Sequence, residues 1–87
     1  MHPCQHIVLG VHVRNRVKNA SMVQNLFTEY GCYIRTRIGL HEVQGDVCSP
    51  NGVIVLELFG DEAKCEELRS KLAAIEGLDV QQMVFTH

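Results

Sequence analysis

Two arginines, two residues apart, give the sequence its clearest anion-binding chemistry. Arg35 and Arg37 lie in a run that alternates in polarity, and a strand would direct both side chains to one side. A guanidinium group offers a planar fork of donors that fits a carboxylate or a phosphate. We therefore expect both arginines to contribute to a ligand-binding site. The alternative is an ion pair, because Glu57 lies on another predicted strand and is expected on the same side.

Imidazole and thiolate groups are a second source of chemistry, since both bind nickel, zinc or copper. The candidate ligands of a divalent transition metal are His12, His41 and Cys48. His6 and His12 share one side of a predicted strand, but about 20 Å separates them there, too far to hold one ion within one chain. The sequence has no CxxC pair and none of the close spacings typical of metal centres. We therefore expect no cofactor, with a divalent transition metal as the alternative.

The pattern of a catalytic site is absent from the sequence. A nucleophilic cysteine needs a base and a third, orienting group, and the residues around Cys48 and His41 supply no such group. An acylphosphatase-type hydrolase needs a glycine-rich loop whose amides hold phosphate. The segment after the first predicted strand contains Arg14 and Arg16 but no glycine. We predict that the protein is not an enzyme, and a small acylphosphatase-like hydrolase is the second alternative.

The elements that position these residues follow from the hydrophobic pattern. Strands are predicted over residues 6–13, 32–43, 53–59 and 78–85, and residues 44–52 read as a turn-rich segment. Two amphipathic helices lie between them, with apolar stripes formed by Ala20, Val23, Phe27 and Tyr30 in the first and by Cys65, Leu68, Leu72 and Ile75 in the second. Asp61 is the expected N-cap of the second helix. Gly31 is expected in a left-handed C-terminal cap of the first, and Gly77 at the end of the second.

This order of elements predicts an α+β fold, the ferredoxin-like βαββαβ architecture, with a four-stranded antiparallel sheet and two helices on one face. The second apolar stripe repeats the first at a constant separation, which indicates weak duplication of a β–α–β unit. The 87 residues are expected to form one domain over 1–87, with a core from about 6 to 85.

One side of the predicted sheet is left without cover. The helix-facing side should carry Ile7, Leu9, Val11, Ile54, Leu56 and Leu58. The other side should carry His6, Val8, Gly10, His12, Tyr33, Arg35, Arg37, His41, Val53, Val55 and Glu57. A surface that mixes valines with charged groups is poorly suited to bulk water. We expect a second copy of the chain to cover it, in a dimer or tetramer.

Composition narrows the function classes. A hydrophobic content of 46%, a charged content of 21% and a net charge of −2 are typical of a globular protein, and they argue against disorder and direct binding to nucleic acid. No stretch approaches the ~20 apolar residues that span a bilayer, and no leader-like pattern opens the sequence. We predict a cytoplasmic protein without membrane contact, in which the cysteines are mostly thiols.

The segment from Val13 to Gly31 resembles the opening of ACT domains, small regulatory modules that bind amino acids. Asn15-Arg16 matches the first half of their characteristic turn, whereas Val17 and Lys18 stand where proline and glycine are usual. The resemblance implies a ligand-binding loop that contains Asn15, Arg16 and Lys18. Lys18 cannot let backbone amides approach an amino acid as glycine does. The alternative is a solvated basic loop that caps the helix.

A second resemblance extends from about His6 to Phe85. Arg37-Ile38-Gly39-Leu40, the run Cys48–Leu58 and the closing Leu72…Ile75-Glu76-Gly77 are similar to short ACT-like proteins described as regulators of the iron-only hydrogenase system. The resemblance implies a non-catalytic regulatory domain, with a fold similar to the C-terminal domain of the nickel-responsive repressor. The dense histidine cluster and DNA-binding ribbon of that repressor are absent from this sequence.

Together these features predict a ligand-sensing ACT-like module that acts through homo-oligomerisation, with a small molecule at the subunit interface and a link to transcriptional regulation. The expected ligand-binding residues are Asn15, Arg16, Lys18, Arg35, Arg37 and His41. A metal-responsive domain that uses His12, His41 and Cys48 is the alternative function.

Overall fold

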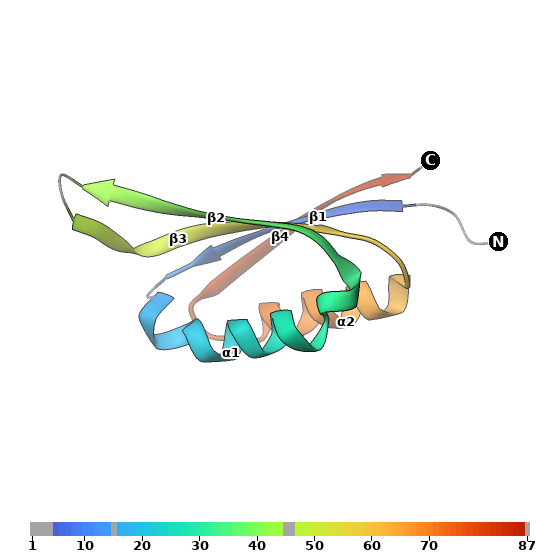
Figure 1. The fold of residues 1–87 in the computed structure, drawn as a ribbon, viewed down its shortest axis with the longest axis horizontal. Coiled ribbons are helices and arrows are strands. Elements are labelled where there is room, and N and C mark those ends of the chain that lie inside the picture. Colours follow the sequence, from blue (N-terminus) through green and yellow to red (C-terminus); the bar gives the residue numbers. More distant parts are fainter. Residues whose placement is uncertain (1–4, 15, 45–46, 87) are drawn as a thin grey trace.

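The computed structural model describes the backbone of residues 5–14, 16–44 and 47–86, with side chains at 6–14, 20–39 and 52–86. The elements are β1 (Gln5–Val13), α1 (Arg16–Glu29), the 3-10 helix η1 (Gly31–Tyr33), β2 (Ile34–Gln44), β3 (Val47–Leu58), α2 (Glu62–Ala73) and β4 (Leu78–Thr86). The strands form an antiparallel sheet in the order β2-β3-β1-β4. Both helices lie on the same side of this sheet (Figure 1). The predicted α+β, ferredoxin-like βαββαβ architecture is confirmed.

The core lies between the sheet and the two helices, and it is aliphatic. Leu9 of β1, Leu56 and Leu58 of β3, and Leu68 and Leu72 of α2 have no exposed surface. Burial of one leucine side chain contributes roughly 1.5–3 kcal/mol, so this layer is what holds the helices on the sheet. In the described part of the chain, neither helix has the length and hydropathy needed to cross a membrane.

The helix ends agree with the caps predicted from the sequence at two positions and differ from them at one. Oδ1 of Asp61 accepts hydrogen bonds from the backbone N–H groups of Ala63 and Lys64, at 2.8 and 3.4 Å, so the predicted N-cap is confirmed. Gly77 follows α2 with a φ of 93°, the left-handed conformation that glycine adopts without strain. The predicted left-handed cap at Gly31 is wrong, because Gly31 begins η1 instead. A 3-10 helix continues the turn with right-handed residues and needs no such cap.

A bulge in β2 inserts one extra residue against β3. Ile34 pairs with Leu58, but the next pair is Thr36 with Glu57, so Arg35 has no partner of its own. Such an insertion bends the strand and shifts the alternation of its side chains. Arg35 and Thr36 both flank Glu57 as a result.

The bulge reverses the predicted sides of the residues that follow it. Arg37 pairs with Leu56, which faces the helices, and Ile38 pairs with Val55, which faces away from them. Arg37 therefore lies on the helix-facing side and Ile38 on the opposite side. The prediction assumed unbroken alternation from residue 32 onward, so it placed both residues on the wrong side.

β2 and β3 continue well past the end of β1 and form a two-stranded arm over residues 41–44 and 47–51. The last pair of β1 with β3 is Val13 with Gly52, whereas β2 and β3 stay paired as far as Gln44 with Val47. The turn predicted over 44–52 is therefore wrong for residues 47–52, which belong to β3. Pro50 is tolerated there because β3 has a neighbour on one side only, where a missing N–H removes no bond from a second ladder. Figure 1 shows the arm projecting from the body, and the molecule measures 50 × 21 × 18 Å.

Candidate functional site

The sheet surface that faces away from the helices, which we call the open face, carries apolar and charged side chains from all four strands. Its described members are His6, Val8, Gly10, His12, Arg35, Thr36, Ile38, Val53, Val55, Glu57, Asp79, Gln81, Met83 and Phe85. Both helices lie on the far side, so neither covers it (Figure 1). The predicted membership holds for β1 and for the described part of β3. It is wrong for Arg37 and for Tyr33, since Tyr33 packs against the core.

Apolar side chains cross the open face in a diagonal band, since Val55 pairs with Gly10 and Val8 pairs with Glu57. Ile38 of β2 lies beside Val55 of β3, and Val8 of β1 lies beside Met83 of β4. Ile38 is 50% exposed, Met83 56% and Phe85 53%. Gly10 lies in the middle of this band, and a Cβ there would have open space around it. Contiguous exposed apolar side chains with polar neighbours are typical of a contact surface.

Glu57 is the centre of one polar cluster on the open face, which we call the Glu57 cluster. Oγ1 of Thr36 donates a hydrogen bond to Oε1 of Glu57 at 2.9 Å. Nε2 of His6 lies 3.2 Å from Oε2 of Glu57, and the Arg35 guanidinium lies 4.0 Å from the same oxygen. Arg35 also stacks over the Phe59 ring, 4.8 Å from its centroid. The ion pair that the sequence offered as the alternative for Arg35 is therefore present.

Asp79 is the centre of the second polar cluster, the Asp79 cluster, near the opposite end of β1. The Arg14 guanidinium donates to Oδ2 of Asp79 at 2.9 Å, and Nδ1 of His12 lies 3.8 Å from the same oxygen. His12 and Asp79 face each other across the β1–β4 ladder. The backbone N–H of Arg14 also donates to the carbonyl of Gly77 at 2.8 Å. This cluster ties the start of the β1–α1 connection to the start of β4.

Arg37 has a different environment from Arg35. Its guanidinium carbon lies 5.3 Å from the centroid of the Phe27 ring, a buried residue of α1. A guanidinium over an aromatic face is attracted by the ring and contributes about 0.5–1 kcal/mol at an exposed site. The two arginines therefore lie on opposite sides of the sheet and do not form the single anion site that their spacing predicted.

The remaining candidate residues fall in parts of the chain whose side chains lie outside the description. Asn15 is outside the described residues altogether. Arg16 and Lys18 lie in the first turns of α1, and His41 and Cys48 are paired with Gly52 and Val43 in the arm, all by backbone only. Their proposed roles in ligand or metal binding stay predictions.

The described side chains are the first place to look for the alternative metal site. In that part of the chain, no three His, Cys, Asp or Glu side chains are grouped as a metal ion requires. His12, one of the candidate metal ligands, lies beside Asp79 instead. The role of His41 and Cys48 as metal ligands is untested, since their side chains fall outside these residues.

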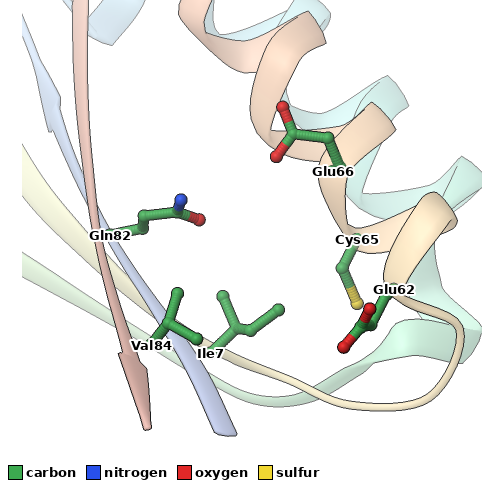
Figure 2. Close-up of a pocket in the computed structure, with 6 residues that line it drawn as sticks. All are labelled: Ile7, Glu62, Cys65, Glu66, Gln82 and Val84. Atoms are coloured by element: carbon green, nitrogen blue, oxygen red, sulfur yellow. The ribbon is translucent and has the colours of Figure 1, made fainter. Parts of the chain in front are cut away.

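A shallow groove of about 180 Å³ lies on the helix-facing side, between α2 and the edge strand β4. Figure 2 shows its lining: Ile7, Glu62, Cys65, Glu66, Gln82 and Val84. Burial raises the pKa of the Cys65 thiol, and the carboxylates of Asp61 and Glu62 raise it further. The hydrogen bond from Arg69 lowers the pKa of Glu66. The groove therefore combines an apolar floor with an acidic wall, and its thiol is held in the unreactive protonated form.

Comparison with known proteins shows the fold and no family. No protein-family model matches the chain, and no curated protein matches it. The uncharacterized protein TM1266 from Thermotoga maritima is similar in structure, with a TM-score of 0.80 and 24% sequence identity, over 94% of this chain and 98% of that one. The C-terminal domain of the MgtC protein from Mycobacterium tuberculosis has a TM-score of 0.65 and 17% identity, over 97% of this chain and 90% of that one.

A third structure with the same fold is that of CPII, a nitrogen regulatory PII-like protein from Thiomonas intermedia, bound to ADP, AMP and acetate. Its TM-score is 0.58 at 8% identity, over 100% of this chain and 92% of that one. At these identities the three likenesses establish the ferredoxin-like architecture and carry no function across.

Sequence reasoning missed two residues that the structure places in the polar clusters. Asp79 stands alone as an acidic residue in a predicted strand, and only the β1–β4 register shows that it faces His12. Thr36 lies between Arg35 and Arg37, so unbroken alternation would place it on the opposite side from them, and the bulge brings it to Glu57. A register prediction for β1 and β4 from the matching lengths of the two strands would have found Asp79, whereas no pattern in β2 reveals the bulge.

Proposed function

We propose that this chain is a non-catalytic regulatory module of the cytoplasm, which binds a small molecule and acts through association with further copies of itself. The observation that carries the proposal is the open face. Ile38, Met83 and Phe85 are exposed there, and Gly10 adds no side chain, on a side of the sheet that neither helix covers. Since burial of apolar area contributes roughly 25 cal/mol per Å², contact between copies would stabilise the fold.

The charges on the open face support association rather than oppose it. In the Glu57 cluster a carboxylate is paired with Arg35, and in the Asp79 cluster a carboxylate is paired with Arg14. Each cluster therefore has nearly balanced charge. Two such faces can approach without the like-charge repulsion that excludes wrong partners.

A regulatory function without catalysis agrees with the chemistry of the described side chains. A nucleophile needs an adjacent base and an orienting group. His6 and His12 each have a carboxylate neighbour that could orient the imidazole as a base. The Cys65 thiol, however, stays protonated because its pKa is raised, and it lies in the groove on the other side of the sheet from both histidines. Non-catalytic action is therefore the reading that we favour.

The resemblance of the run Cys48–Leu58 to regulators of the iron-only hydrogenase system suggests the biological setting of the proposal. CPII, described as a nitrogen regulatory protein and bound to ADP, AMP and acetate, offers a parallel for sensing by this architecture. We propose a ligand that contains a carboxylate or phosphate group, because the candidate residues Asn15, Arg16, Lys18, Arg35 and His41 are polar or basic. We place it at an interface between copies.

A thermal-shift screen tests ligand sensing. The purified chain is melted with amino acids, nucleotides and divalent metal ions, and its molar mass is followed in the same samples. A ligand at 100 times its Kd should add roughly 2.7 kcal/mol to the free energy of unfolding, and it should alter self-association.

Two matched variants locate the site. Arg16→Gln should reduce the thermal shift, whereas Lys64→Gln, which removes a half-exposed cation paired with Glu67 on α2, should leave it unchanged. The absence of any shift across the panel, together with an unchanged molar mass, would contradict a sensing function.

A further inference from the structure

The two edges of the sheet differ in their protection against pairing with another strand. β2 forms one edge and β4 the other. β2 has a bulge at Arg35, a second irregularity between His41 and Val43, and a further arginine, Arg37. Bulges and charged side chains are features that keep an edge strand from joining a neighbour. β2 is therefore a protected edge.

β4 has none of these features. It is paired with β1 in unbroken register from Leu78 to Thr86, and its sequence LDVQQMVFT contains no lysine, arginine or proline. All its residues except Leu78 and Val80 are exposed, including the apolar Met83, Val84 and Phe85 in succession. A long, regular edge strand with apolar side chains on both sides is a template for a further strand.

We propose that β4 pairs antiparallel with β4 of a second copy of this chain, so that the sheet continues across a two-fold axis. This inference rests on the self-association proposed above and assigns its first contact to β4: edge pairing builds the dimer, and the open face stays available for contact between dimers. Pairing gives partners to the backbone N–H and C=O groups along the outer edge of β4. With the axis near Val84, Met83 of each copy lies beside Phe85 of the other on the open face, and the two Val84 side chains meet on the helix-facing side.

The second copy is the occupant because β4 complements itself. Its only charged residue is Asp79, which Arg14 neutralises at 2.9 Å. A second β4 that runs in the opposite direction therefore faces apolar and amide side chains and no charge of the same sign. Apolar pairs directly across an antiparallel ladder contribute roughly 0.2–1 kcal/mol each relative to alanine pairs.

α2 lines a groove beside the same edge. Glu62 and Glu66 line the groove next to β4 (Figure 2), and Arg69, which bonds Glu66, follows them along that side of the helix. A two-fold axis beside β4 reverses the direction of α2 in the second copy. The groove of about 180 Å³ becomes part of the interface.

A substitution at Val84 distinguishes β4 pairing from stacking of two open faces. Its side chain is 45% exposed and lines the groove on the helix-facing side. Ile38 is 50% exposed and lies on the open face of the other edge strand. Val84→Lys and Ile38→Lys therefore each replace an aliphatic side chain with a charged one, at similar exposure, on the two candidate surfaces.

Sedimentation equilibrium of the wild-type chain and both variants is the test. The expected result is a rise of at least about tenfold in the dimer Kd for Val84→Lys, because each dimer gains two ammonium groups at the joint. Ile38→Lys should leave the Kd within about twofold of the wild-type value. Circular-dichroism melting checks that both variants are folded. Amide hydrogen exchange gives an independent readout, since the outer N–H groups of β4 should be protected at high concentration and lose protection on dilution.

The outcomes distinguish this inference from the proposed function. A wild-type dimer that Val84→Lys leaves intact and Ile38→Lys dissociates would overturn β4 pairing, assign the interface to the open face, and leave the regulatory function standing. A dimer that neither variant weakens would also overturn β4 pairing. A wild-type chain that stays monomeric at its solubility limit would overturn both β4 pairing and self-association.

Discussion

At the scale of single residues, Arg35 and Arg37 show how one inserted residue changes the chemistry of a strand. Their spacing predicted one anion site, but the bulge at Arg35 places this residue beside Glu57 and leaves Arg37 over the Phe27 ring. Alternation of polarity reports the period of a strand and does not report an insertion in it. The expected ion pair of Glu57 with Arg35 is confirmed, because β3 pairs with β1 in unbroken register there and Glu57 keeps its predicted side of the sheet.

The cysteines give a prediction at this scale. Cys32 is exposed, whereas Cys65 is buried and the pKa of its thiol is raised. Because the thiolate is the reactive form, iodoacetamide at pH 8 should label Cys32 rapidly and Cys65 only as the chain unfolds. Peptide mass mapping reads the two sites separately. Rapid labelling of Cys65 in the folded protein would contradict its placement in the core.

The same thiol predicts how stability depends on pH. The unfolded chain releases the Cys65 proton above about pH 9.0, the ordinary value for cysteine, while the folded chain retains it because the pKa is raised. The folded state then binds more protons, so the free energy of unfolding falls as pH rises through this range. Urea unfolding of Cys65→Ala should show a smaller alkaline loss of stability than the wild-type chain. An equal loss in both would assign the effect to other groups.

At the scale of elements, the sequence predicts the strands and helices well where local chemistry determines them. Leu9, Leu56 and Leu68 recur at strand or helix spacing and are all fully buried, and Asp61 caps α2 as its position indicates. The errors lie where longer-range pairing decides. Gly31 resembles a helix cap in the sequence but starts η1, and residues 47–52 resemble a turn but belong to β3, which pairs with β2 on both sides of a register shift. The polar clusters depend on strand register, which no single segment of the sequence specifies.

The cap of α2 gives a prediction for one element. Asp61→Ala removes the acceptor of the bonds from Ala63 and Lys64, and it should lower the free energy of unfolding by about 1 kcal/mol. Asp61→Asn keeps a capping oxygen and should lose only a small part of that stability. Urea titration of the three proteins provides the comparison. Equal stability of wild-type and alanine proteins would show that the cap contributes nothing.

At the scale of the whole molecule, the chain has a larger accessible surface than a compact monomer of the same mass. Its accessible surface is 5690 Å², against about 5,200 Å² expected for a compact monomer of this mass. The Cα radius of gyration is 13.6 Å, against about 12 Å expected for this length. The arm, which extends past the end of β1, and the open face both add to this surface. An isolated two-stranded ribbon is only marginally stable in water. Contact with further copies would cover both.

The central claim is self-association, and the molar mass of the purified chain in solution tests it most directly. Light scattering coupled to size-exclusion chromatography, over a series of loading concentrations, should give at least twice the chain mass of 9.8 kDa and a mass that falls on dilution. A constant 9.8 kDa across the whole series would contradict the account.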